Sequence, residues 1–325
     1  MYVRLDLIAI GLGLLVPCGA SSCTHLASTS SATAADEEPA KAQSASDTDS
    51  AQAWLLVDAD MGLDDARVIL ALPLQGAFHV SGITTVEGSA GAMKGADNAL
   101  RLLEAVGAKS IPVAIGATKT IAGHAIPAPM WRSMAESLGG LALPAPTRPM
   151  EDTPAAVFLA SALRLSASPV TILALGPLTN LARALSDDPT LVEKIQLVAM
   201  LGDFMQCSSY NCSADPVAAD IVRNSGVRRL MMMPSATDRI TFDEAFLARV
   251  QALSGSAGKL MVQMMQHHIG RMKLWDDSVL EALLEPEHFT TIAAGPSTAL
   301  IVDLDPEGVE QALLDLWNAQ SPDSP

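Results

Sequence analysis

The stretch that decides the fold is Leu55-Leu56-Val57-Asp58-Ala59-Asp60-Met61-Gly62-Leu63-Asp64-Asp65-Ala66. Its apolar first half, which ends at Asp58, is typical of a short buried strand. Four carboxylates lie within the eight positions 58–65, Asp58 included, and an amphipathic run continues from Ala66 to about Leu74. A strand, an acidic turn and a helix in this order indicate a ligand site at the carboxyl edge of a parallel sheet.

The acidic turn favours a metal or sugar site. Carboxylates crowded beside a buried strand repel one another unless a cation neutralises them, and Ca²⁺ takes carboxylate and carbonyl oxygens as ligands. Gly62 permits a turn tight enough to aim several of them at one point. Helix capping accounts for Asp64 or Asp65 alone, and the ligand spacing excludes an EF-hand. An aspartyl phosphotransferase using Asp58 and Asp60 also fits this stretch taken by itself.

The composition restricts the class of protein. The chain has 325 residues, of which 49% are hydrophobic, enough for one large α/β domain or two smaller ones. The net charge of −16 argues against a nucleic-acid partner, which would need a basic face. The aromatic content of 4% also weakens a platform for stacking single-stranded bases.

Residues 1–23 are expected to be a targeting segment. A weakly positive start with Arg4 precedes an apolar core from Leu7 to Pro17 that is too short for a comfortable membrane span. Small residues precede Cys23 as in a bacterial lipoprotein cleavage site, so Cys23 is the expected lipidation site. Cys18 lies in a competing site, and an ordinary secretory cut near Ala20 is the alternative. The protein is therefore expected to be exported to the periplasm or cell surface, with a lipid as its only membrane anchor.

The remaining chain divides into three parts. Residues 24–53 are small and polar, which predicts a flexible linker; residues 54–318 form the expected folded domain, and residues 319–325 a disordered tail. Strands are expected at 54–57, 80–85, 112–115, 170–175, 195–201 and 229–233, and helices at 64–74, 93–106, 154–165, 178–185, 216–225, 242–253 and 258–272. This alternation predicts an α/β fold with a doubly wound, mostly parallel sheet and flanking helices. The Pro- and Gly-rich stretch 116–149 is expected to be a flap or binding loop.

The opening stretch resembles the N-terminal signature of the nucleoside hydrolase family (inosine-uridine preferring type), usually read D-T-D-P-G-x-D-D-A. Two further segments match in order: residues 176–180 read G-P-L-T-N, and residues 215–219 fit D-P-x-A-A. The matches extend over roughly Trp54 to Asp303. The resemblance implies the Rossmann-like core of that family. It also argues against the phosphotransferase, which would need later Lys and Asp motifs.

The resemblance implies a calcium site. Its protein ligands would be Asp60, Asp65, Asp276 and the backbone carbonyl of Leu175. Because calcium lowers the pKa of a bound water only modestly, a carboxylate base is needed beside it, and the resemblance assigns that role to Asp60.

The resemblance also implies an N-glycosidase with an oxocarbenium-like transition state. Asp64 would accept a hydrogen bond from a ribose hydroxyl, with Asn211 assisting, while Asp58 braces the turn.

The chain departs from the family pattern at positions that would contact the substrate. Ser89 replaces the Asn of T-T-V-x-G-N, which contacts the ribose. Asp203 and Ser209 replace an Asn and a Glu that bind the 5′-hydroxyl. Trp275 stands where one subgroup has a His that protonates the leaving base; it resembles the Trp of the purine-preferring subgroup and can stack on a purine, and core filling is the alternative.

These departures leave three functions open. The first is a ribonucleoside hydrolase, with purine nucleosides as the favoured substrates. The second is a calcium-dependent nucleoside- or sugar-binding lipoprotein that has lost turnover. The third is a hydrolase for a related N-riboside modified at its 5′ position. The resemblance further implies a homo-oligomer.

Cys207 and Cys212 bracket the segment that contains Ser209 and Asn211. In an exported protein, two cysteines five residues apart are expected to close a small disulfide loop. Two free, partly buried thiols are the alternative.

Overall fold

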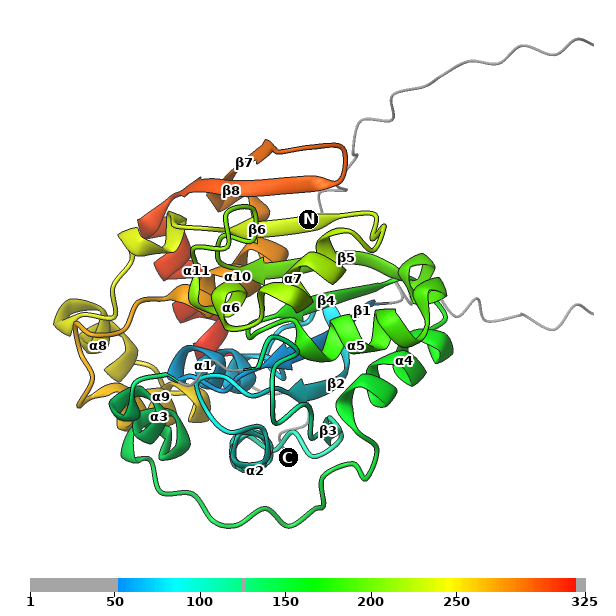
Figure 1. Ribbon diagram of the computed structural model, residues 1–325. Helices are drawn as coiled ribbons and strands as arrows, with labels where there is room; N and C mark the ends of the chain where they lie inside the picture. Colours follow the sequence, from blue (N-terminus) through cyan, green and yellow to red (C-terminus); the bar gives the residue numbers. More distant parts are fainter. Residues whose placement is uncertain (1–51, 124–126, 320–325) are drawn as a thin grey trace, which may run out of the picture. The chain divides into compact units, whose positions relative to one another are not determined.

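The computed structural model describes residues 52–123 and 127–319 (Figure 1). The expected targeting segment with Cys18 and Cys23, residues 24–51 of the expected linker and residues 320–325 of the expected tail lie outside the described residues. Among the helices of the described ranges, none is both long enough and apolar enough to cross a membrane.

The core is an eight-stranded sheet in the order β3-β2-β1-β4-β5-β6-β8-β7. The strands are β1 (Ala53–Ala59), β2 (Phe78–Thr85), β3 (Val113–Ala114), β4 (Val170–Ala174), β5 (Ile195–Leu201), β6 (Leu230–Met233), β7 (Phe289–Ala293) and β8 (Thr298–Leu304). Every neighbouring pair is parallel except β7 and β8. The predicted α/β fold with a mostly parallel sheet is therefore confirmed.

Helices connect and cover these strands. They are α1 (Leu63–Ala71), α2 (Ala92–Ala105), α3 (Pro129–Glu136), α4 (Ala155–Leu165), α5 (Thr179–Asp187), α6 (Tyr210–Ala214), α7 (Pro216–Arg223), α8 (Glu244–Gln251), α9 (Ser256–Met265), α10 (Trp275–Leu284) and α11 (Pro306–Asn318). Short 3₁₀ turns lie at η1 (Leu138–Gly140), η2 (Pro189–Lys194), η3 (Ala236–Arg239) and η4 (Pro286–His288).

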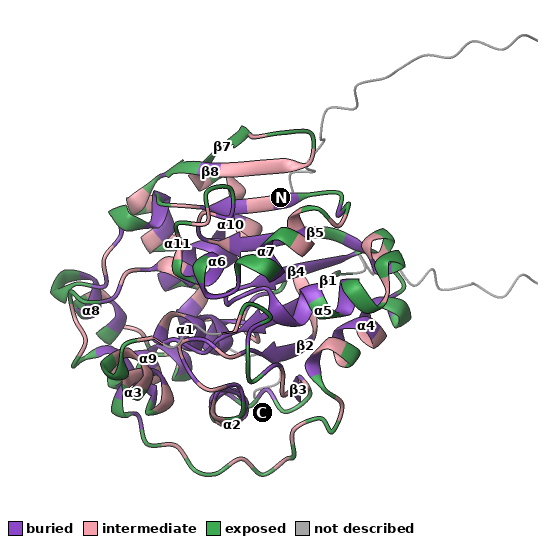
Figure 2. Cartoon of the chain, in the orientation of Figure 1, coloured by how far each residue is buried: buried purple, intermediate pink, exposed green. Residues whose placement is uncertain are grey.

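The sheet is buried on both faces because successive strand residues point to opposite helix layers. Leu55 and Val57 of β1 pack into the apolar cluster that contains α1, α2 and α8 to α11. Leu56, between them, packs into the cluster formed with α4, α5 and α7. Figure 2 shows the central strands as buried and the outer surfaces of the helices as exposed. This explains why the strands are continuous apolar runs in the sequence.

The strand order places a ligand crevice beside β1. Since β1 lies between β2 and β4, the chain continues from β1 to one side of the sheet and returns to the other at β4. Loops that leave the carboxyl ends of strands diverge at such a switch point and leave a crevice. Asp60 follows β1 and Leu175 follows β4, and the Leu175 N–H donates to the Asp58 carbonyl at 2.8 Å. The fold thus brings two predicted site residues to one edge.

All six predicted strands are present, but the C-terminal part was predicted incompletely. No element was expected at β7, β8 or α11. β7 exposes four of its five residues, so no buried apolar run marks it in the sequence. Trp275, which follows the helix expected at 258–272, is the first residue of a separate helix, α10. The preceding helix ends at Met265, and Gly270 adopts a left-handed conformation (φ 71°) that separates the two helices.

A buried ion pair joins α1 to α10. The Arg67 guanidinium and the Asp277 carboxylate are 0% and 1% exposed, with Nη2 and Oδ2 2.6 Å apart. Nη2 also donates to the Lys273 carbonyl at 2.7 Å. The cost of desolvating both charges offsets much of their attraction, so the pair fixes geometry more than it adds stability. It fixes the two helices that carry Asp64, Asp65 and Asp276.

Glu281 of α10 provides a test of the core that is independent of any ligand. Its side chain is buried, and Oε2 has no partner among the described residues. Burial, followed by the charges of Glu285 and Asp277, raises the pKa of its carboxyl from 4.5 to about 8. The folded state therefore keeps a proton that the unfolded chain releases, so stability falls as the pH rises between these two values.

Replacing Glu281 by Gln removes this pH-dependent loss. We expect Glu281→Gln to be more stable than the wild type by on the order of 2–4 kcal/mol at pH 8.5, and nearly equal to it at pH 4.5. Urea unfolding at the two pH values measures both differences. Equal stability of the variant and the wild type at pH 8.5 would contradict the raised pKa of the buried Glu281 carboxyl.

Candidate active site

Acids from α1 and α10 meet at the carboxyl edge of the sheet. Carboxylate oxygens of Asp64, Asp65 and Asp276 lie within 4.8 Å of one another. Burial first, and then the neighbouring carboxylates, raise the pKa of Asp65 and of Asp276 well above its ordinary range. One oxygen of Asp276, Oδ1, is buried without a hydrogen-bond partner among the described residues. A cation would relieve this repulsion and use the free oxygen, so the donor set fits a metal ion.

Asp60 lies beside this cluster but is not one of its three closely spaced acids. It is 2% exposed, and its Oδ2 accepts from the Ser89 N–H at 2.9 Å and from the Ser89 hydroxyl at 3.3 Å. Burial raises the pKa of Asp60. The Asp65 carboxylate accepts from the backbone N–H groups of Asp60 (3.1 Å) and Gly62 (2.9 Å). A side chain in the first turn of α1 thus holds the acidic turn in its conformation.

Two glycines allow the neighbouring loops to reach Asp60. A Cβ atom on Gly88 would overlap the Asp60 carboxylate, and one on Gly176 would press against the Asp60 backbone and Cβ. Each of these glycines belongs to a motif identified in the sequence. Their physical role is close backbone approach to Asp60.

The remaining motif residues hold these loops together rather than facing a ligand. Asp58 Oδ1 accepts from the Thr84 hydroxyl at 2.7 Å and from Asn180 Nδ2 at 2.8 Å, which supports its expected bracing role. Asn180 Nδ2 also donates to the Thr85 carbonyl at 2.9 Å. Asp215 caps α7 through the Ala218 N–H at 3.1 Å, and its Oδ2 accepts from the Thr179 hydroxyl at 2.6 Å.

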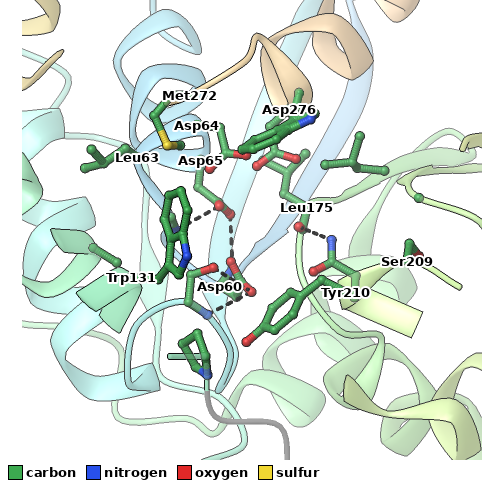
Figure 3. Close-up of a pocket in the computed structure, with 18 of the residues that line it drawn as sticks. Asp60, Leu63, Asp64, Asp65, Trp131, Leu175, Ser209, Tyr210, Met272 and Asp276 are labelled. Carbon is green, nitrogen blue, oxygen red and sulfur yellow. Dashed lines mark hydrogen bonds between the residues drawn. The ribbon is translucent and has the colours of Figure 1, made fainter. Parts of the chain in front are cut away.

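A cavity of about 400 Å³ opens beside the acids (Figure 3). Its volume is in the range of small-molecule sites. The predicted site residues that line it are Asp60, Asp64, Asp65, Ser89, Leu175, Ser209, Asn211, Trp275 and Asp276. Asn211 Nδ2 donates to the Leu175 carbonyl at 2.6 Å, so the expected carbonyl ligand and the expected ribose contact are neighbours.

Asp203 differs from its expected placement at the substrate. It is not among the residues that line the cavity. Its carboxylate accepts from the Met205 and Gln206 N–H groups at 2.9 and 3.0 Å and from the Ser208 hydroxyl at 2.7 Å. The Asp203 side chain therefore points toward the backbone of its own loop, where its carboxylate finds all of these hydrogen-bond donors. We therefore leave Asp203 out of the proposed substrate site.

The segment after Asp203 is cross-linked. Cys207 and Cys212 form a disulfide, with their Cα atoms 5.0 Å apart. The bridge spans Ser209, Tyr210 and Asn211, all of which line the cavity. The disulfide therefore restricts the conformations that the segment 207–212 can adopt at the wall of the cavity.

Two aromatic residues of the cavity were not identified in the sequence. Trp131 of α3 and Tyr210 of α6 both line it, and Figure 3 shows Asp60 between them. Trp131 lies within the expected flap 116–149, whose helix begins with Pro129. A Pro at the first helical position was an available signal for this helix. Trp131 itself had no motif around it.

The cavity combines two kinds of surface. One part presents buried carboxylates, a backbone carbonyl and the Asn211 amide, which suit a metal ion and the hydroxyl groups of a sugar. Another part presents Trp131, Trp275 and Met272, which suit a flat apolar ring. A small molecule that carries a sugar and a planar ring satisfies both.

Comparisons with known proteins agree with this arrangement. The family model "Inosine-uridine preferring nucleoside hydrolase" matches residues 55–314. The "Probable uridine nucleosidase 1" of Oryza sativa subsp. japonica is 29% identical over 290 residues, which cover 82% of this chain and 88% of that protein. The "Pyrimidine-specific ribonucleoside hydrolase RihA" of an Escherichia coli O7:K1 strain is 31% identical over 254 residues, covering 73% and 81% of the two chains.

Solved structures share the fold. A plant nucleoside hydrolase has a TM-score of 0.73 at 23% identity, and a purine-preferring ribonucleoside hydrolase from Gardnerella vaginalis has a TM-score of 0.72 at 21% identity. Each alignment covers 82% of this chain and 99% of the other. The family model and the two named relatives confirm the expectation of an N-glycosidase at the level of the family. Since the family model covers most of the domain, from β1 into α11, the chain belongs to the inosine-uridine preferring nucleoside hydrolase family.

Proposed function

We propose that this protein is a calcium-dependent ribonucleoside hydrolase that cleaves the N-glycosidic bond to give free base and ribose. The observation that carries the proposal is the single cavity in which the Asp64-Asp65-Asp276 cluster and Asp60 lie together with Trp131 and Trp275. The family membership sets the reaction class, and the cavity supplies the residues for it.

The metal ligands would be Asp60, Asp65, Asp276 and the Leu175 carbonyl. All four donors are oxygen atoms, which favours a hard ion such as Ca²⁺ over Zn²⁺, whose sites use nitrogen and sulfur. A bound calcium ion would supply positive charge that orients a water molecule and the 2′- and 3′-hydroxyls of the ribose. Asp64 and Asn211 accept from and donate to those hydroxyls.

Asp60 is the proposed general base. It takes a proton from the attacking water while the oxygen of that water bonds to C1′ of the ribose. The bond between C1′ and the base nitrogen breaks, and its electron pair leaves with the base, which takes up a proton from solvent. The two hydrogen bonds from Ser89 hold the Asp60 carboxylate in place for this step.

The base is proposed to be a purine. Trp131 and Trp275 offer indole surfaces to a ring within the same cavity, and stacking strength grows with ring area. The names of the two relatives above point instead to uridine and pyrimidine nucleosides. The nucleoside panel described below decides between the two.

Two other functions keep a specific observation in their favour. The placement of Asp203 and the short side chain of Ser209 favour a substrate altered at its 5′ position. The substitutions at Ser89 and Trp275 favour a nucleoside-binding protein without turnover. Export through the segment 1–23, lipidation at Cys23 and a homo-oligomeric state remain part of the proposal, supported by the sequence and by the resemblance.

The test of the proposal is release of reducing sugar from a panel of purine and pyrimidine nucleosides by the soluble domain. Each reaction is run with calcium and with chelator. Calcium-dependent release from any nucleoside supports the hydrolase. Calcium-dependent nucleoside binding without release would replace it with the binding protein, and release from 5′-modified N-ribosides alone would redefine the substrate.

The tryptophans give a prediction within this assay. Trp131→Ala and Trp275→Ala are each expected to lower kcat/KM for purine nucleosides by about 5- to 100-fold, because a stacked base is worth about 1–3 kcal/mol. The loss should be smaller for pyrimidine nucleosides, whose rings cover less of an indole. Trp54→Phe, on β1 at the other end of the strand from Asp60, is the matched control. Equal losses of kcat/KM for purine and pyrimidine nucleosides would contradict a stacking role for Trp131 and Trp275.

A further inference from the structure

Arg132 follows Trp131 on α3, but its side chain makes a contact that the proposed reaction does not yet use. Its Nη2 forms an ion pair with the Glu87 carboxylate, on the loop after β2. The two side chains are only 17% and 19% exposed. Nη1 lies 3.6 Å from the Glu136 carboxylate, one helical turn further along α3. Such a shielded pair is screened by salt less than a surface ion pair.

The same carboxylates also bind the loop 87–91, of which Glu87 is the first residue. At the C-terminal end of the loop, Glu87 Oε2 accepts from the Ala92 N–H at 3.4 Å, and Glu136 Oε1 accepts from the Gly91 N–H at 3.3 Å. Ser89 lies between Glu87 and Gly91, and its N–H and hydroxyl donate to Asp60. The loop that orients Asp60 is therefore fastened to α3, through Arg132 and Glu136.

The charges of this pair also reach the cavity. Burial first, and then the Asp60 charge, raise the pKa of the Tyr210 hydroxyl, while Arg132 lowers it and Glu87 raises it. Tyr210 and Trp131 both line the cavity, and Figure 3 shows them on opposite sides of Asp60. Because Arg132 and Glu87 shift this pKa in opposite directions, the pair bears on the site through the position of its side chains and not through a net charge.

We propose that Arg132 is a positioning residue. Through Glu87 it holds the loop 87–91 where Ser89 orients Asp60, and through its own helix it holds Trp131 against the cavity. A single ion pair thereby links the wall that contacts the base to the group that activates the water. This inference rests on the proposed function and adds to it a residue that touches neither substrate nor metal.

The test is a double-mutant cycle on the intact domain with calcium and the best nucleoside of the panel. Arg132→Met and Glu87→Gln are each expected to lower kcat at least tenfold and to raise KM severalfold, because small displacements of reacting groups are costly. The double variant should lose no more than the worse single variant, and Arg132→Lys should recover part of the activity. Arg101→Met, which removes a similarly shielded ion pair with Asp97 on α2, is the matched control and should keep kcat within twofold of the wild type.

Hydrogen exchange supplies a readout that does not depend on turnover. In Arg132→Met, amides of the loop 87–91 and of α3 should exchange faster together, while those of α2 and α5 stay unchanged. If the wild type hydrolyses no nucleoside, the proposed function fails and this measurement alone judges the ion pair. Kcat of Arg132→Met within twofold of an active wild type, losses that multiply in the double variant, or unchanged exchange in the loop 87–91 would each overturn the inference.

Discussion

Asp60→Asn is expected to lower kcat by about 10³-fold or more while leaving the fold intact, since removing a general base costs about 10²–10⁴-fold and Asp60 is also a proposed metal ligand. Asn keeps a carbonyl oxygen that can accept the two hydrogen bonds from Ser89. It also removes one buried carboxylate whose pKa is raised by burial. In chelator the melting temperature should therefore stay the same or increase.

Steady-state kinetics with calcium in excess measure this loss, and calorimetric titration shows how much of it comes from weaker calcium binding. Asp220→Asn changes an exposed carboxylate on α7 and serves as the control for the loss of one negative charge. If Asp60→Asn hydrolyses nucleosides at more than a tenth of the wild-type rate, Asp60 is not the base.

Removing calcium is expected to abolish turnover and to destabilise the folded domain. An ion at a hundred times its Kd stabilises the folded state by about 2.7 kcal/mol, which corresponds to roughly 5–10 °C in melting temperature for a domain of this size. The cause is the cluster of half-buried Asp64 with buried Asp65 and Asp276, whose carboxylates repel one another without a cation. Thermal melts in chelator, in Ca²⁺ and in Mg²⁺ measure the effect and its selectivity.

Asp276→Asn sharpens this experiment, because the difference in melting temperature between the variant and the wild type should have opposite signs in chelator and in calcium. In chelator the variant loses one repelling charge and should melt above the wild type. With calcium it should gain little and melt below the wild type. A wild-type melting temperature that chelator leaves unchanged would contradict the metal site, and an Asp276→Asn variant with the full calcium response would exclude Asp276 as a ligand.

The sequence by itself determined the fold class and the acidic part of the site. Residues 55–66 join a buried strand to a helix through carboxylates and a glycine, and all of these features are local along the chain. A parallel sheet brings the carboxyl ends of its strands to one edge, so the positions of Asp60 and of Leu175 followed from the alternation of strands and helices. β7 was missed because four of its five residues are exposed, which leaves no buried apolar run in the sequence. β8 and α11 were missed although both bury apolar residues, among them Ile301 of β8 and Trp317 of α11.

Only the tertiary structure decided which side chains complete the cavity. Trp131 comes from a stretch with no motif, and its place depends on how α3 packs against the loop after β2. Asp203 has a side chain that could accept a hydrogen bond from a substrate hydroxyl, yet three donors from its own loop hold its carboxylate away from the cavity. The direction of a side chain depends on partners that are distant in the sequence or that compete with a ligand. The spacing of residues along one chain does not specify those partners, whereas it does specify β1, the acidic turn and the carboxylates of Asp60, Asp64 and Asp65.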